Sequence, residues 1–160
     1  MIRELALASA LACAPAAARQ ASAACATVAP TQAKQGALNE INQFRARNGR
    51  AALCYNAKID SAATWLARDM ATKNHFSHTD SLGRNGGQRL TAAGYAWSWW
   101  GENIAAGQTT WSGAVVAWQN SSSHRAHLLS TNFRKIGLGQ AYSATSQWKY
   151  YWVANFGSPR

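Results

Sequence analysis

The stretch WKYYWVANF, residues 148–156, decides the fold class of this 160-residue chain. Every second residue belongs to one set, Trp148, Tyr150, Trp152, Ala154 and Phe156, and Lys149, Tyr151, Val153 and Asn155 lie between them. A repeat of two residues is the period of a β-strand, and this pattern predicts a strand with one buried face. The run Ile136-Gly137-Leu138-Gly139 is expected to be its antiparallel partner, across a turn at residues 142–146. The end of the chain is therefore predicted to form a hairpin.

Before this hairpin, apolar residues recur at the helical period. Helices are expected over residues 35–47, 57–73, 88–93 and 124–129, with one more beginning after Thr110. Asn56 is expected to cap the second of these helices, because its side chain can accept hydrogen bonds from the first free backbone amides. Helices followed by a hairpin predict an α+β fold, with the helices packed on a small antiparallel sheet.

The first 23 residues have the pattern of a signal peptide. An apolar run at residues 5–18 is followed by the small-residue site Ala21-Ser22-Ala23, which is typical of a cleaved export signal. The run is shorter than the roughly 20 residues that span a bilayer. We therefore expect a secreted, periplasmic or extracellular protein with a signal peptide at residues 1–23 and an N-terminal arm at residues 24–36.

Two cysteines would remain after such cleavage, Cys25 and Cys54. An even pair in an exported chain predicts a disulfide between them. Two unpaired thiols are the alternative that the sequence leaves open.

The chain is strongly basic, with 16 Lys and Arg against 6 Asp and Glu and a net charge of +10. Such a charge favours encounter with anionic surfaces such as phospholipid or cell-wall polymer. The basic residues stand singly rather than in a block, so no specific binding of nucleic acid is expected. The sequence also has no His-Glu-x-x-His, Gly-x-Ser-x-Gly or phosphate-binding glycine loop, and it gives no sign of the enzymes that use them.

Three short motifs carry side chains capable of chemistry: Phe76-Ser77-His78, Gly101-Glu102-Asn103 and Ser123-His124-Arg125. Two imidazoles and a carboxylate can bind a divalent metal, share protons or polarise a water molecule. The same three groups can instead form a buried hydrogen-bond network that joins a loop, a sheet and a helix. The residues alone support both interpretations equally.

Together with Gly94-Tyr95, Trp118 and Phe133-Arg134-Lys135-Ile136-Gly137, these motifs resemble the CAP superfamily. This superfamily comprises the cysteine-rich secretory proteins, antigen 5 and the pathogenesis-related 1 proteins, and the chain is similar to its short bacterial members. The resemblance covers about residues 37–157, and we assign a CAP domain to residues 37–158. It implies an α-β-α sandwich around a small central antiparallel sheet.

The resemblance also implies a cavity lined by two histidines and two acidic residues. His78, Glu102 and His124 match three of these positions, and Ser121 stands where the second acid is expected. The implied cavity residues are thus His78, Glu102, Ser121 and His124, and the implied ligands of a divalent metal, with zinc the expected ion, are His78, His124 and Glu102. Serine cannot accept a proton near neutral pH, which weakens any two-carboxylate chemistry.

The function expected from these observations is that of an exported, monomeric binding or interaction module with a metal-holding cavity. The implied partners are a lipid or sterol, or an anionic component of the cell envelope. One alternative is a metal-assisted hydrolase acting on a peptide or cell-wall substrate. Another is a basic, aromatic-rich surface adhesin. The sequence leaves open whether the protein is an enzyme.

Overall fold

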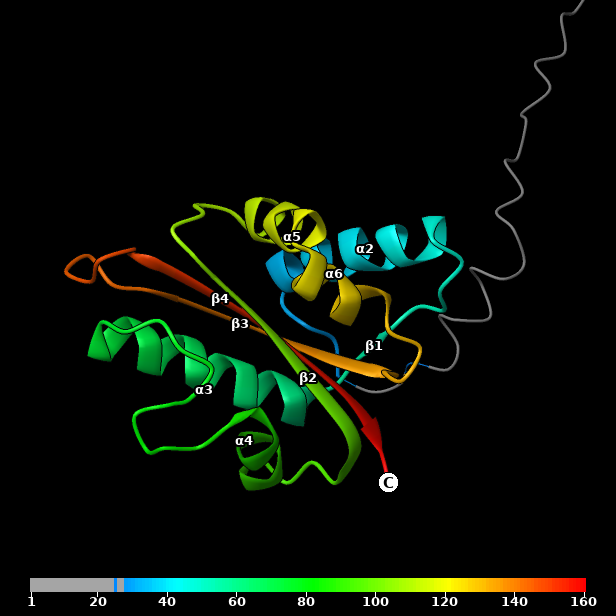
Figure 1. The fold of residues 1–160 in the computed structure, drawn as a ribbon, viewed down its shortest axis with the longest axis horizontal. Coiled ribbons are helices and arrows are strands. Elements are labelled where there is room, and N and C mark those ends of the chain that lie inside the picture. The colour runs from blue at the N-terminus through cyan, green and yellow to red at the C-terminus, as the bar shows by residue number, and fades with distance from the viewer. Residues whose placement is uncertain (1–24, 26–27) are drawn as a thin grey trace, which may run out of the picture.

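The computed structural model describes residues 25 and 28–160. Within that part of the chain, five helices and four strands form an α-β-α sandwich, which confirms the predicted α+β fold class (Figure 1). The predicted signal peptide, residues 1–23, lies outside the described residues.

Helices cover both faces of the sheet. Figure 1 shows α2, α5 and α6 above the sheet and α3 and α4 below it. The helices are α2 (Gln32–Arg47), α3 (Ala57–Lys73), α4 (Gly86–Ala92), α5 (Trp111–Asn120) and α6 (Ser122–Leu129). None of the helices in the described part of the chain combines the length and the apolar character needed to cross a bilayer.

The sheet has the strand order β1-β3-β4-β2. Its strands are β1 (Cys54–Tyr55), β2 (Trp97–Ala106), β3 (Lys135–Tyr142) and β4 (Tyr150–Pro159). The three long strands pair antiparallel, including the predicted hairpin of β3 and β4. The two-residue β1 pairs parallel to β3, so the sheet as a whole is mixed.

The central strand β4 is buried on both faces, so the prediction of a half-buried strand is wrong. Trp152, Ala154 and Phe156 belong to the hydrophobic cluster under α2, α5 and α6. Tyr151 and Val153 belong to a second cluster under α3. The alternating residues of the sequence therefore lie on two different faces of the strand, and both of these faces are buried.

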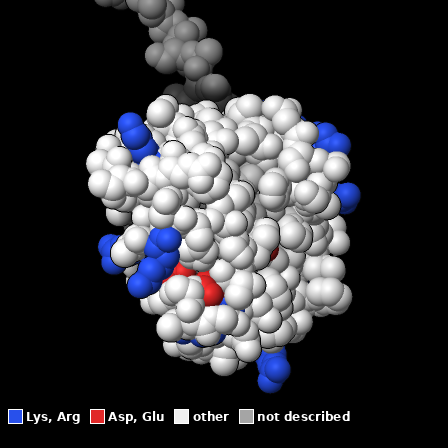
Figure 2. Space-filling model, turned by 60° about the vertical axis from the view of Figure 1, so that its left-hand side comes forward, with Lys and Arg blue, Asp and Glu red and all other residues white. Residues whose placement is uncertain are grey.

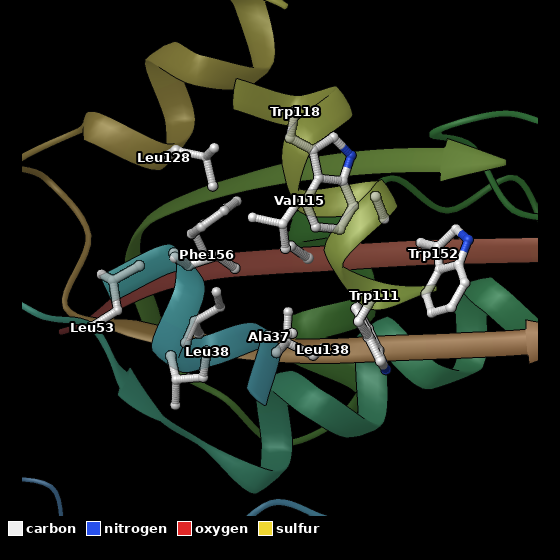
Figure 3. Close-up of a cluster of buried hydrophobic side chains, with 14 of the residues drawn as sticks. Ala37, Leu38, Leu53, Trp111, Val115, Trp118, Leu128, Leu138, Trp152 and Phe156 are labelled. Carbon is white, nitrogen blue, oxygen red and sulfur yellow. The ribbon is translucent and has the colours of Figure 1, made fainter. Parts of the chain in front are cut away.

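The first of these clusters contains most of the large apolar side chains (Figure 3). Val115 and Trp118 from α5 and Leu128 from α6 are fully buried and converge on Phe156 of the sheet. This packing fixes α5 and α6 against the sheet.

Helix α3 has the predicted bounds and the predicted cap. The Asn56 side chain accepts hydrogen bonds from the backbone amides of Lys58 and Ile59, and the helix ends at Asn74, whose φ of 53° is left-handed. The helix lies unusually close to β3 because glycines face it. A Cβ atom on Gly137 would lie 2.0 Å from the backbone nitrogen of Asp60, and one on Gly139 would lie 2.2 Å from the backbone carbonyl group of Ala63.

Strand β2 has no counterpart in the sequence-based prediction. Its central residues Glu102 and Asn103 are polar yet buried, so the segment lacks the apolar alternation that identifies strands. The other differences are small: α2 and α6 begin a few residues earlier than predicted, and α4 is shifted by one or two residues.

The segment before α2 is joined to β1. Cys25 and Cys54 form a disulfide pair with their Cα atoms 5.2 Å apart. The pairing attaches Cys25, in the predicted N-terminal arm, to the edge of the sheet.

We expect Gly137→Ala to destabilise the protein by at least about 3 kcal/mol, because the added methyl group would overlap the backbone of α3. The matched control is Gly36→Ala in α2, where a Cβ atom would meet nothing within 4 Å. That control should stabilise the protein by about 0.5–1 kcal/mol, since alanine favours a helix over glycine. Urea unfolding monitored by circular dichroism measures both changes. Equal stability of the two variants would contradict the close packing of α3 on β3.

Candidate functional site

The candidate site is organised by two consecutive residues of β2. Successive side chains of a strand point to opposite faces of the sheet. Accordingly, Glu102 contacts Arg89 of α4 on one face, and Asn103 contacts α6 on the other. The Gly-Glu-Asn motif therefore links the two helical layers at one edge of the sheet.

Both carboxylate oxygens of Glu102 are engaged. Arg89 donates from Nη2 to Oε2 at 2.6 Å, and His78 donates from Nδ1 to Oε1 at 2.9 Å. The side chains of Glu102 and Arg89 are 2% and 1% exposed, whereas the His78 side chain is 58% exposed. A buried ion pair thus holds one nitrogen of a surface imidazole, and the ring extends its Nε2 edge away from the carboxylate.

Arg89 also fixes the loop that carries His78. Its guanidinium donates to the backbone carbonyl of His78 at 3.0 Å and to that of Arg84 at 2.6 Å. Asp80 lies 3.8 Å from Arg89 and pairs with Arg84 at 2.9 Å. The loop is therefore tied to α4 by charge-assisted hydrogen bonds, which are stronger than neutral ones.

On the other face, Asn103 holds the two histidines of α6. Its Nδ2 donates to the backbone carbonyl of His124 at 2.9 Å, and its Oδ1 accepts from Nδ1 of His127 at 2.8 Å. Burial lowers the pKa of His124, and the nearby His78 and His127 lower it further. Burial also lowers the pKa of His127, although a hydrogen bond with the backbone of Glu102 opposes this. Both imidazoles are therefore neutral at neutral pH.

A cavity of about 330 Å³ lies beside His124. It is lined by Phe76, Ile104, Ala105, Ala106, Gln108, Ala117, Trp118, Ser121, His124 and Trp148. Ser121 and His124 are thus the two predicted cavity residues that line it. His78 and Glu102 are not among its lining residues and belong to the buried ion-pair network instead.

The three predicted metal ligands differ in their surroundings: His78 is exposed, Glu102 is buried, and His124 lines the cavity. His78 and Glu102 are in direct contact, and His124 is close enough for the charge of His78 to lower its pKa. Among residues 25 and 28–160, no group of three or more His, Cys, Asp or Glu side chains is arranged to hold a metal ion. Glu102 has the position of a residue that orients His78, since both of its oxygens are already engaged.

Sequence reasoning missed Arg89 as part of the site. A single arginine in a short helix gives no sign of its burial, which depends on the carboxylate of Glu102. Asn103 stands inside the Gly-Glu-Asn motif and was identified only as part of it. Its place directly after Glu102 in the sequence is the one signal that could have pointed to it.

The model of the CAP family, the cysteine-rich secretory protein family, matches residues 38–156. This match covers most of the chain. The protein belongs to the CAP family. The predicted resemblance is thereby confirmed.

Among curated relatives, this CAP protein is 33% identical over 104 residues to the uncharacterized protein YkwD of Bacillus subtilis. The match covers 65% of this chain and 40% of YkwD, so the chain spans less than half the length of that relative.

Two solved structures share the fold. An extracellular protein with an SCP domain from Bacillus anthracis has a TM-score of 0.66 and 27% identity, over 82% of this chain and 44% of that one. An outer surface protein of Borrelia burgdorferi has a TM-score of 0.73 and 22% identity, over 83% and 97% of the two chains. The second likeness, at this identity, concerns the fold alone.

We expect Glu102→Ala to cost about 3–5 kcal/mol of unfolding free energy, because it removes the nearer carboxylate from the buried guanidinium of Arg89 and leaves only Asp80, 3.8 Å away. The double variant Arg89→Met/Glu102→Leu should lose less than Glu102→Ala, since it removes both charges and refills the space. Arg125→Ala, at an exposed position, is the control and should change little. Urea unfolding measures all three, and a double variant less stable than Glu102→Ala would contradict the predicted role of the charges.

We also expect stability to fall as the pH is lowered below about 6.5, the ordinary pKa of histidine. The folded-state pKa values of His124 and His127 are lowered, so the unfolded chain binds protons more readily in this range. The stabilising contribution of the neutral rings is thus present above pH 6.5 and lost as the pH falls through the folded-state values. A His124→Gln/His127→Gln variant should lose less stability than the unmodified protein between pH 7 and pH 5 in urea unfolding. An identical pH dependence of the two proteins would disprove this origin.

Proposed function

We propose that this CAP protein is an exported binding module in which His78 and His124 hold a divalent metal ion, zinc being the best-suited one. The observation that carries the proposal is the 2.9 Å hydrogen bond from Nδ1 of His78 to the buried carboxylate of Glu102. Histidines that bind metals usually donate their second ring nitrogen to such a carboxylate, which fixes the tautomer and the direction of the ring.

The residues present fit such an ion in three respects. His78 is oriented by Glu102, with Nε2 on an exposed ring. His124 has a lowered pKa, and a metal requires the neutral imidazole. Zinc accepts imidazole nitrogen readily. With two imidazoles from the protein and Glu102 in an orienting role, we expect weak binding.

The same geometry favours binding over hydrolysis. A metal-assisted hydrolase needs a carboxylate or imidazole placed to accept a proton from water. Glu102 has one oxygen bound to Arg89 and the other to His78, and Ser121 supplies no second carboxylate. The metal would supply a positive centre that attracts an electron-rich ligand, and the protein side chains would position that ligand.

Export and an envelope partner are supported by two further observations. The similar Bacillus anthracis protein is extracellular, and the chain has a net charge of +10. Figure 2 shows the basic side chains set apart on this face, with broad uncharged surface between them. This dispersion suits general attraction to an anionic component of the cell envelope more than an adhesive patch of defined pattern.

We expect the purified protein to bind zinc, and a His78→Ala/His124→Ala variant to bind it at least about tenfold more weakly. Occupancy of the unmodified protein should fall when the pH drops below 6.5, because protonated imidazole cannot ligate. His75→Ala is the matched control, since His75 pairs with Asp69 instead of Glu102. Calorimetric zinc titration measures the affinities. Unchanged affinity of the double variant would place any zinc elsewhere and refute the proposal.

A further inference from the structure

An open groove of about 750 Å³ runs along α3, which lies in one outer layer of the sandwich (Figure 1). Its lining residues on this helix extend from Ala57 to Lys73, a rise of about 24 Å at 1.5 Å per residue. Lys34 and Tyr55 line it from outside the helix, and Lys34 pairs there with Asp60 of the first turn. A groove of this length suits an extended chain better than a single small molecule.

A smaller hollow of about 150 Å³ continues the groove toward α4. Ser61 and Trp65 line both spaces, so the two meet at the indole of Trp65. This tryptophan is 37% exposed, and the guanidinium carbon of Arg84 lies 4.4 Å from the centroid of its ring. The cation–π contact fixes the ring. An exposed and fixed indole offers apolar surface on which the C–H face of a sugar ring can pack.

The groove presents positive charge to a ligand, although two acids line it. Asp60 pairs with Lys34 at 2.6 Å and Asp69 pairs with an imidazole at 3.0 Å, and the side chains of these acids are only 13% and 6% exposed. Arg68 and Lys73 are exposed. No ion pair within the described part of the chain includes either of them. An anionic ligand would therefore supply the counter-ions that these two cations lack.

The spacing of the two cations points to the kind of anion. Arg68 and Lys73 are five residues apart, about 7.5 Å along the helix axis. A strand of duplex DNA carries one charge about every 3.4 Å, so this groove would leave most of its phosphates unpaired. A glycan with an acidic group on every sugar or every second sugar matches the sparse charge better. The exposed hydroxyl groups of Ser61 and Thr72 can exchange hydrogen bonds with its hydroxyls.

We propose that this groove binds a strand of an acidic polysaccharide. A sugar ring packs on Trp65, and acidic groups of the strand pair with Arg68 and Lys73. The inference rests on the proposed function, which includes an anionic partner in the cell envelope, and it names the surface and the class of polymer. The dispersed charge of the protein attracts such a polymer, and the groove supplies the contacts that hold it.

The test is calorimetric titration of the unmodified protein with oligogalacturonate at low salt, in the presence of a chelator. Its methyl ester, which keeps the sugar rings and removes the charges, is the comparison probe. We expect oligogalacturonate to bind at least about fivefold more tightly than the ester, the effect of two exposed ion pairs. Added salt should weaken this binding. Equal binding of the two probes would overturn the proposal. Tighter binding of duplex DNA or of phosphatidylglycerol vesicles would also overturn it.

Variants locate the binding. Arg68→Gln/Lys73→Gln should weaken binding of oligogalacturonate about fivefold to tenfold, because both ion pairs are lost. Arg47→Gln/Arg50→Gln is the matched control, since it removes the same charge from exposed positions outside the groove, and it should bind almost normally. Equal losses in the two variants would show attraction by net charge alone and refute the groove. Trp65→Ala should weaken binding about threefold to fivefold, and the charge variants keep the proposal testable if this change prevents folding.

The result is separable from that of the zinc titration. Arg68→Gln/Lys73→Gln should bind zinc normally, because neither His78 nor His124 lines the groove. Binding of oligogalacturonate in the groove without zinc binding would overturn only the metal proposal. Zinc binding without binding of oligogalacturonate would overturn only the groove proposal.

Discussion

The close approach of α3 to β3 constrains the rest of the molecule. Because Gly137 and Gly139 have no side chains, the helix backbone occupies the space where their Cβ atoms would lie. The end of the helix then anchors the loop that carries His78: Asp69 accepts from the backbone of Ser81 at 2.8 Å and binds His75 at 3.0 Å. Burial alone would raise the pKa of Asp69, but these partners hold it below its usual value. The position of His78 therefore depends on contacts made along the whole of α3.

In the layer formed by α2, α5 and α6, polar side chains connect α6 to α2 and to the sheet. Arg45 of α2 is almost fully buried and donates to the backbone carbonyls of Leu128 at 2.6 Å and Ser130 at 3.0 Å. Its burial, with the nearby Arg50 and Arg134, lowers its pKa to about 10. Asn103 binds the backbone of His124 nearer the start of the same helix. Helix α6 is thus fixed near both ends, and this determines the direction in which His124 faces the cavity.

Local sequence signals predict much of the fold. The burial of a residue whose partners lie far away in the sequence could not be predicted from such signals. Helix α3 followed from its apolar period and the cap at Asn56, because both operate within a few residues. Strand β2 escaped detection, since Glu102 and Asn103 interrupt its apolar pattern. The motifs indicated that His78 and Glu102 belong together, as their hydrogen bond shows. Arg89 could not be foreseen, because a buried guanidinium is stable only beside a carboxylate from another element.

Ser121 stands where the family resemblance implies an acidic residue, and this leaves the cavity without a charged side chain. A carboxylate at that position would place a charge in the cavity beside His124, whereas serine leaves the lining uncharged. A buried ionic group lies instead around Glu102, where Arg89 stands between Glu102 and Asp80. Neutral imidazole at His124 completes this separation, since burial lowers its pKa. One edge of the sheet thus combines a fixed ionic network, which orients His78, with an uncharged, largely apolar cavity beside His124.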